Sequence, residues 1–158
     1  MLKRLNNQKG VTLTELIVAM LVMSIIMLAV TAVFLPMYNA YINANSMAEV
    51  NNLLNALSSV IMNDIEDAED IDWDDDDGTL TITRVGAPRE IHYTIGTGAA
   101  AGLLLRNGTP VFAGEYYKGK TVQIGYAEEA AGISAVTLTI LGVTRTYAAR
   151  PVGMQGVP

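Results

Sequence analysis

The first residues that could do chemistry are a glycine, an apolar residue and a carboxylate near the N-terminus. Gly10 is followed by Val11, and Glu15 stands directly before an apolar run at 16–35. An ionised carboxylate beside such a run is costly unless it is paired or neutralised. A cut after Gly10 would create an α-ammonium on Val11. That positive charge is able to pair with the Glu15 carboxylate in apolar surroundings.

The apolar run itself predicts a membrane-spanning helix. Residues 16–35 read LIVAMLVMSIIMLAVTAVFL, in which only Ser24 and Thr31 carry polar side chains. Twenty residues make a helix of about 30 Å, which matches the hydrocarbon core of a bilayer. The ten residues before Val11 contain no acid and three basic residues, Lys3, Arg4 and Lys9. Positive charges on this side keep an N-terminus in the cytoplasm.

Three simpler interpretations of this N-terminus compete. A secretory signal peptide has an apolar stretch of about 7–15 residues, shorter than this one, although 30–32 (VTA) resembles a weak cleavage site. A plain single-span anchor fits the length, and a buried helix of a soluble protein fits it less well. None of the three explains Glu15. An enzyme tethered by an ordinary anchor would also show no dependence on Gly10 or Glu15.

Residues 8–16, QKGVTLTEL, resemble the prepilin signal of type IV pilins and type II secretion pseudopilins. That signal is a short basic leader ending in Gly, an apolar first mature residue, Thr, Glu at the fifth mature position and then an unbroken apolar helix. The resemblance implies that a prepilin peptidase cuts between Gly10 and Val11 and methylates the Val11 nitrogen. It also implies that Glu15 acts in filament assembly. Val11 departs from the pattern, because the family usually has Phe there.

The resemblance also implies partners and a location. The partners are prepilin peptidase, other pilins or pseudopilins, an inner-membrane assembly platform and membrane lipid. The chain is expected to be a single-pass protein of the cytoplasmic (inner) membrane, with its N-terminus in the cytoplasm and its globular domain outside. From there it is expected to enter a pilus or pseudopilus.

Composition restricts the function of the remaining chain. The 158 residues contain no cysteine, so disulfides and thiolate chemistry are excluded. Without the three basic residues of the leader, seven Lys and Arg face sixteen Asp and Glu, a net charge of −9. Nucleic-acid binding needs Lys and Arg to neutralise phosphates, so this balance argues against it. Nucleic-acid binding would require a local basic patch, formed by Arg84, Arg89, Arg106, Lys118 and Lys120.

The helical pattern resumes beyond the membrane segment. Apolar residues recur at steps of three and four and predict an amphipathic helix packed on a sheet; they are Met47, Val50, Leu54, Leu57, Ile61 and Ile65. Pro36 lies between the two halves and is expected to kink or split one long helix. The expected divisions are a cleaved leader at 1–10, a membrane or filament-core helix at 11–36, an amphipathic helix at 37–70, a β-sheet domain at 71–150 and a loose tail at 151–158.

An acidic segment at 64–77 follows this helix. Clustered carboxylates suit hard cations, so Asp72, Asp74 and Asp76 are weak candidates for calcium ligands. The spacing does not fit the EF-hand loop. The segment is expected to be a solvated loop without tight calcium binding, and no other cofactor is expected.

From Thr79 onward the sequence is typical of strands. Strands are expected at 79–85, 90–95, 103–106, 121–126, 135–141 and 143–148, and Asn107-Gly108 predicts a two-residue hairpin. The expected fold class is α+β, a long N-terminal helix followed by an antiparallel β-sheet, an order that resembles the pilin fold. Residues 91–95 and 104–108 faintly resemble J-type pseudopilins and related minor pilins.

Catalysis has no support in the sequence. The one histidine, His92, lies in a strand pattern, and there is no phosphate loop or nucleophile elbow. The leading hypothesis is a structural subunit, a minor pilin or pseudopilin of a type IV pilus or secretion filament. The alternative is a competence-type pseudopilin or minor pilin that binds DNA or a surface ligand.

Overall fold

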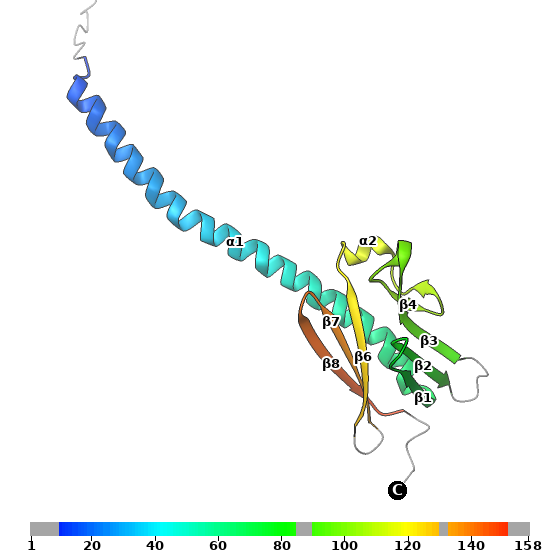
Figure 1. The fold of residues 1–158 in the computed structure, drawn as a ribbon. Helices are drawn as coiled ribbons and strands as arrows, with labels where there is room; N and C mark the ends of the chain where they lie inside the picture. The colour runs from blue at the N-terminus through cyan, green and yellow to red at the C-terminus, as the bar shows by residue number, and fades with distance from the viewer. Residues whose placement is uncertain (1–9, 85–89, 130–132, 152–158) are drawn as a thin grey trace, which may run out of the picture. The chain divides into compact units, whose positions relative to one another are not determined.

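The computed structural model describes residues 10–84, 90–129 and 133–151. The chain divides into two compact units, Met1–Ser46 and Met47–Pro158. Helix α1, Leu13–Glu66, begins in the first unit and ends in the second (Figure 1). Of the expected tail at 151–158, only Pro151 lies within the described residues.

Pro36 does not split helix α1, contrary to one of the two outcomes expected from the sequence. Helix α1 continues through Pro36 without interruption. A proline in a helix removes one backbone hydrogen bond, in this case the one that the Ala32 carbonyl would accept. Long runs of helical hydrogen bonds on both sides offset that local loss.

The second unit contains the predicted buried face of α1. Val50, Leu54, Leu57, Ile61 and Ile65 have at most 1% of their surface exposed, and the apolar periodicity is therefore confirmed for these five positions. Met47 is 54% exposed and does not belong to the buried face. Leu53, which the predicted stripe did not include, is 2% exposed and belongs to the core.

Two antiparallel sheets complete the second unit (Figure 1). The first sheet has five strands in chain order: β1 Ala68–Asp74, β2 Thr79–Arg84, β3 Glu90–Ile95, β4 Leu104–Arg106 and β5 Thr109–Pro110. The second has three: β6 Val122–Glu129, β7 Ile133–Ile140 and β8 Val143–Ala149. Two short helices, η1 Gly98–Ala100 and α2 Gly114–Tyr117, lie between strands. The α+β order of a long helix followed by antiparallel strands is confirmed.

The acidic segment 64–77 is not the continuous loop expected from its composition. Residues 68–74 form strand β1, which pairs with β2 in a register that places Ile71 opposite Ile82 and Trp73 opposite Leu80. Alternation explains the difference: Ile71 and Trp73 pack against the core, while Asp72 between them and Asp74 after them are exposed. Strand propensity depends on such packing more than on the residue types alone. Residues 75–78 form the turn to β2.

The Asn107-Gly108 hairpin is confirmed. Asn107 has φ 51° and Gly108 has φ 76°, as the left-handed positions of a two-residue hairpin turn require. The turn joins β4 to β5, with Arg106 opposite Thr109. The side-chain oxygen of Asn107 also accepts a hydrogen bond of 2.8 Å from the His92 amide, which ties the turn to β3.

The core of the second unit includes two fully buried tyrosines, Tyr93 and Tyr117. Each hydroxyl needs a partner to offset the loss of water. Tyr117 donates to the Leu104 carbonyl at 3.4 Å, and burial raises the pKa of its phenol. Tyr93 donates to the Asp64 carboxylate at 2.6 Å. This second contact belongs to a polar cluster that the sequence did not reveal.

Candidate functional site

The N-terminus of α1 is capped by reciprocal hydrogen bonds between Thr12 and Glu15. The Glu15 Oε2 accepts hydrogen bonds from the Thr12 amide at 3.0 Å and from the Thr12 hydroxyl at 2.9 Å. The Thr12 hydroxyl in turn accepts from the Glu15 amide at 3.3 Å. This is a capping box, which satisfies amides left free at a helix start. Glu15 therefore stabilises its own helix start besides any role outside the chain.

The sequence contained a signal for this capping box. Thr and Glu stand three residues apart at the start of an apolar helix, which is the spacing that a capping box uses. The sequence analysis considered only the Val11 ammonium as a partner of Glu15 and missed Thr12.

The expected cleavage site lies just before this cap. Gly10 and Val11 precede the helix and are exposed, and a Cβ added at Gly10 would contact nothing within 4 Å. An exposed backbone outside a helix is accessible to a peptidase. The leader residues Lys3, Arg4 and Lys9 lie outside the described residues.

Helix α1 contains a segment long and apolar enough to cross a membrane, and none of that segment is buried within the structure. The two polar side chains of 16–35 are satisfied within the helix. Ser24 donates to the Met20 carbonyl at 2.8 Å, and Thr31 donates to the carbonyls of Met27 and Leu28 at 3.0 Å. Neither hydroxyl would therefore be left without a partner in hydrocarbon.

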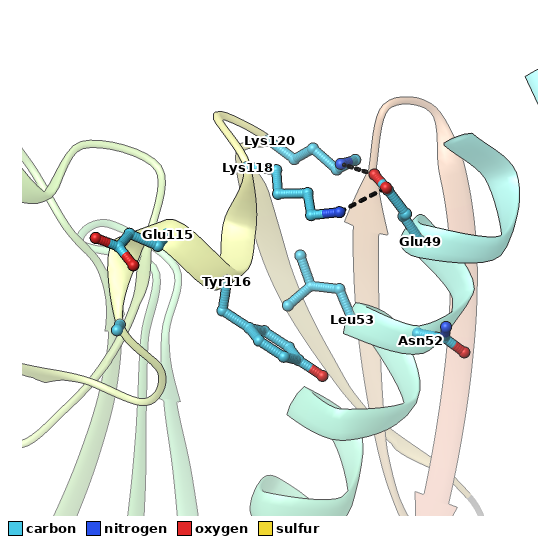
Figure 2. Close-up of a pocket in the computed structure, with 8 residues that line it drawn as sticks. Glu49, Asn52, Leu53, Glu115, Tyr116, Lys118 and Lys120 are labelled. Atoms are coloured by element: carbon cyan, nitrogen blue, oxygen red, sulfur yellow. Dashed lines mark hydrogen bonds and ion pairs between the residues drawn. The ribbon is translucent and has the colours of Figure 1, made fainter. Parts of the chain in front are cut away.

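In the second unit, two lysines converge on one carboxylate beside a cavity of about 440 Å³ (Figure 2). Lys118 Nζ lies 2.6 Å from Glu49 Oε1, and Lys120 Nζ lies 2.9 Å from Glu49 Oε2. Hydrogen bonds from the two lysines lower the pKa of Glu49. The contacts join α1 to the segment between α2 and β6. Leu53 and Tyr116 line the same cavity.

A second polar cluster surrounds Asp64, whose side chain is 6% exposed. Arg84 Nη2 donates to Asp64 Oδ1 at 2.6 Å, and Arg106 donates to both carboxylate oxygens at 2.7 and 3.1 Å. With the Tyr93 hydroxyl, the carboxylate accepts four hydrogen bonds. Burial raises the Asp64 pKa, but hydrogen bonds from Arg106 and Tyr93 and the positive charges of both arginines leave it lowered overall. Asp64 is thus held as a charged carboxylate.

The expected basic patch does not persist as a set of free cations. Arg84 and Arg106 pair with Asp64, and the two lysines pair with Glu49. The fifth candidate, Arg89, lies outside the described residues. Paired cations offer little charge to nucleic acid, since phosphate contacts depend on net positive potential.

The calcium candidates lie on β1 and the turn after it. Asp72 and Asp76 are exposed, while Asp74 Oδ1 accepts hydrogen bonds from the amides of Asp76 at 2.9 Å and Asp77 at 3.4 Å. Within 10–84, 90–129 and 133–151, no three His, Asp or Glu side chains are grouped to hold a metal ion.

We expect no calcium binding in the micromolar range that sensor sites reach, because these carboxylates do not converge on one point. Isothermal calorimetry on the detergent-solubilised full chain tests this, with the variant Asp74→Asn/Asp76→Asn as the control. Micromolar affinity in the native chain that disappears in the variant would overturn the expectation.

His92 has no arrangement typical of a catalytic base. The His92 side chain is 47% exposed. Its Nδ1 lies 3.1 Å from the Thr81 hydroxyl, and its Nε2 lies 3.7 Å from the Glu90 carboxylate. Thr81 lies on the adjacent strand β2 and Glu90 lies on the same strand, β3, as expected for a half-exposed strand residue.

Comparison with known proteins identifies one feature. Residues 5–31 match the family model described as the prokaryotic N-terminal methylation motif. No curated protein and no solved structure matches the chain. The matched segment covers the expected cleavage site, Glu15 and most of the apolar run. It supports the resemblance to type IV pilins and pseudopilins and does not distinguish the J-type subgroup.

Proposed function

We propose that this protein is a structural subunit, a minor pilin or pseudopilin, of a type IV pilus or a type II secretion-type filament. One observation carries the proposal: the methylation motif at 5–31 coincides with an exposed, apolar helix whose first turn contains Glu15. In this proposal the chain consists of a leader at 1–10, a filament-core helix at 11–36, an amphipathic helix at 37–70, a β domain at 71–150 and a tail at 151–158. No group in the described residues has the arrangement of a catalytic site.

In this proposal a prepilin peptidase removes the leader by cutting between Gly10 and Val11 and then methylates the Val11 nitrogen. The leader charges Lys3, Arg4 and Lys9 hold the N-terminus on the cytoplasmic side. Before assembly the protein spans the inner membrane once, with the second unit outside. Its partners are the peptidase, other pilins or pseudopilins, the assembly platform of the inner membrane and lipid.

Glu15 has a specific place in this proposal. Packing helices into a filament core removes water, and an unpaired carboxylate and an unpaired ammonium are both costly there. Pairing the Glu15 carboxylate of one subunit with the Val11 amine of a neighbour offsets both costs and fixes the axial position of the subunits. The Thr12 contacts hold this carboxylate at the helix start before assembly.

The alternative is a competence-type pseudopilin or minor pilin that binds DNA or a surface ligand. DNA binding would need free cations, and Arg84, Arg106, Lys118 and Lys120 are each paired with a carboxylate. The structural role is therefore favoured over DNA capture.

Intact-mass analysis of protein extracted from membranes tests the processing step. In cells with an active prepilin peptidase we expect a mature chain that begins at Val11 and carries one methyl group. Cells that lack the peptidase serve as the control and should retain the leader. A mature N-terminus at Val33, or a retained leader in the presence of the peptidase, would contradict the proposal.

A further inference from the structure

The charge pattern of α1 does not by itself fix how deep the helix lies in a bilayer. No charged residue stands between Glu15 and Glu49, so residues 16–48 form one uncharged stretch. At a rise of about 1.5 Å per residue this stretch is about 50 Å long, about 20 Å longer than the hydrocarbon core of a bilayer. The helix could therefore slide along the membrane normal without moving a charge into hydrocarbon. Another feature has to set its depth.

Hydrogen bonding limits where the helix can leave the hydrocarbon. Ser24 and Thr31 donate to carbonyls of the preceding turn, so neither hydroxyl needs a partner outside the helix. The next polar side chains along the chain, Tyr38, Asn39 and Tyr41, are exposed and make no hydrogen bond with any residue that the structure describes. A polar group without a partner is costly in hydrocarbon. The outer boundary of the hydrocarbon is therefore expected between Thr31 and Tyr38.

The two tyrosines lie on one face of α1. Tyr38 is 53% exposed and Tyr41 is 70% exposed, and residues three positions apart are neighbours on a helix surface. The Phe34 ring, one turn earlier, stacks on the Tyr38 ring with 6.5 Å between the ring centroids. Along this face an apolar ring is thus followed by two rings that each carry a hydroxyl. Such amphipathic rings are enriched where hydrocarbon meets the lipid headgroups.

The position of the tyrosines along the helix matches the headgroup layer. With 16–35 in the hydrocarbon, Tyr38 and Tyr41 lie about 5 and 9 Å beyond it along the helix. Helix side chains lean toward the N-terminus, so both rings reach back toward the membrane. The headgroup layer on each side of the hydrocarbon is about 5–8 Å thick. Both hydroxyls are therefore within reach of headgroup oxygens.

We propose that Tyr38 and Tyr41 anchor α1 in the headgroup layer of the outer leaflet, where their hydroxyls donate to phospholipid oxygens and fix the depth of the helix. The inference rests on the membrane-spanning part of the proposed function. Phospholipid surrounds this level of the helix before assembly, whereas a neighbouring subunit covers it only in a filament. The anchor also keeps the exposed amides of Asn43 and Asn45 in water.

Cysteine labelling measures the depth of the helix, since the chain has no native cysteine. Full-length chains with Ala32→Cys, Ala40→Cys or Ala44→Cys are reconstituted in vesicles of phosphatidylethanolamine and phosphatidylglycerol and treated with a membrane-impermeant maleimide. Labelling is normalised to Gln123→Cys, an exposed position on β6, so that the orientation of the chains cancels. We expect Ala32→Cys to be protected and Ala44→Cys to react as Gln123→Cys does. Ala40→Cys should react at an intermediate rate.

Removing the anchor should let the helix sink. The variant Tyr38→Leu/Tyr41→Leu keeps bulky side chains and loses both hydroxyls. Labelling of Ala40→Cys in this variant should fall at least about threefold, because the thiolate that reacts is disfavoured in hydrocarbon. The control Tyr38→Trp/Tyr41→Trp keeps amphipathic rings and should retain native labelling. Unchanged labelling in the leucine variant, or an equal fall in the tryptophan variant, would overturn the anchor.

The same labelling in cells separates lipid from a protein partner. If the leucine variant alters labelling in cells that contain other pilins but not in vesicles of the chain alone, a protein covers the tyrosines and the lipid anchor is wrong. The vesicle measurement depends on neither cleavage nor assembly. Reaction of Ala32→Cys at the rate of Gln123→Cys would show that α1 does not span the bilayer, and the proposed function would fail with the anchor. Protection of Ala32→Cys with no effect of the leucine variant would disprove the anchor alone.

Discussion

Glu15→Val should give a chain that is inserted, cleaved after Gly10 and stable, yet absent from filaments. Insertion and cleavage do not require the carboxylate, because the membrane helix is apolar without it and the peptidase acts at Gly10. Assembly does require it, since the Val11 ammonium of a neighbour would lose its counter-charge in a dry helix bundle. Immunoblots of membrane and sheared-filament fractions, with cross-linking to other pilins, measure the result.

The capping box supplies two controls that separate charge from helix capping. Glu15→Gln keeps an oxygen able to accept from Thr12, as Gln does in capping boxes, but removes the charge. Thr12→Ala breaks the cap and keeps the charge. If the ion pair is the cause, Glu15→Gln fails to assemble and Thr12→Ala assembles. Normal incorporation of Glu15→Val would break the link between this carboxylate and assembly, leaving the cleavage signal as the support for a pilin-like protein.

Asp64→Ala should strongly destabilise the second unit. It leaves Arg84, Arg106 and Tyr93 without their common acceptor in a largely buried position. Breaking a buried ion pair costs about 3–5 kcal/mol. We expect a loss of unfolding free energy at the lower end of this range, because the two arginine side chains are 34% and 36% exposed and can be hydrated again. Chemical denaturation of the detergent-solubilised chain, with exposed Asp70→Ala as the control, measures the loss.

The same cluster predicts a pH dependence. The Asp64 pKa is lowered in the folded state, so its contribution to stability is fully present above the ordinary value of 3.8. That contribution is lost as the pH falls through the lower folded value. The difference in stability between the native chain and Asp64→Asn should therefore be large at neutral pH and shrink below about pH 4. A difference that stays constant from neutral to acidic pH would show that the ionised carboxylate does not contribute.

The sequence predicted those parts of the fold that depend on neighbouring residues. The Asn107-Gly108 hairpin, the strand at 90–95 and the buried face of α1 follow from turn chemistry and from residue spacing. The strand at 68–74 was not predicted, because its acidic residues are typical of a solvated loop and outnumber the alternating Ile71 and Trp73. Its pairing with β2 outweighs the poor strand propensity of Asp.

The polar clusters could not be predicted in the same way. Asp64 pairs with residues 20, 29 and 42 positions later, and Glu49 with residues 69 and 71 positions later. No local periodicity relates such pairs. Arg84 and Arg106 were identified as candidates for a basic patch, and only their position in the folded sheet shows that a buried helix residue neutralises them.

The order of the strands has a consequence for how the second unit is built. Each strand of the first sheet pairs with the strand next to it in the chain, from β1 to β5, and the same is true from β6 to β8. Pairing of this kind closes only short loops, and such topologies fold quickly. In a chain delivered from its N-terminus, each new strand meets a partner that has already emerged. No strand has to remain exposed while it waits for a distant segment, which limits the time in which an unpaired edge could aggregate.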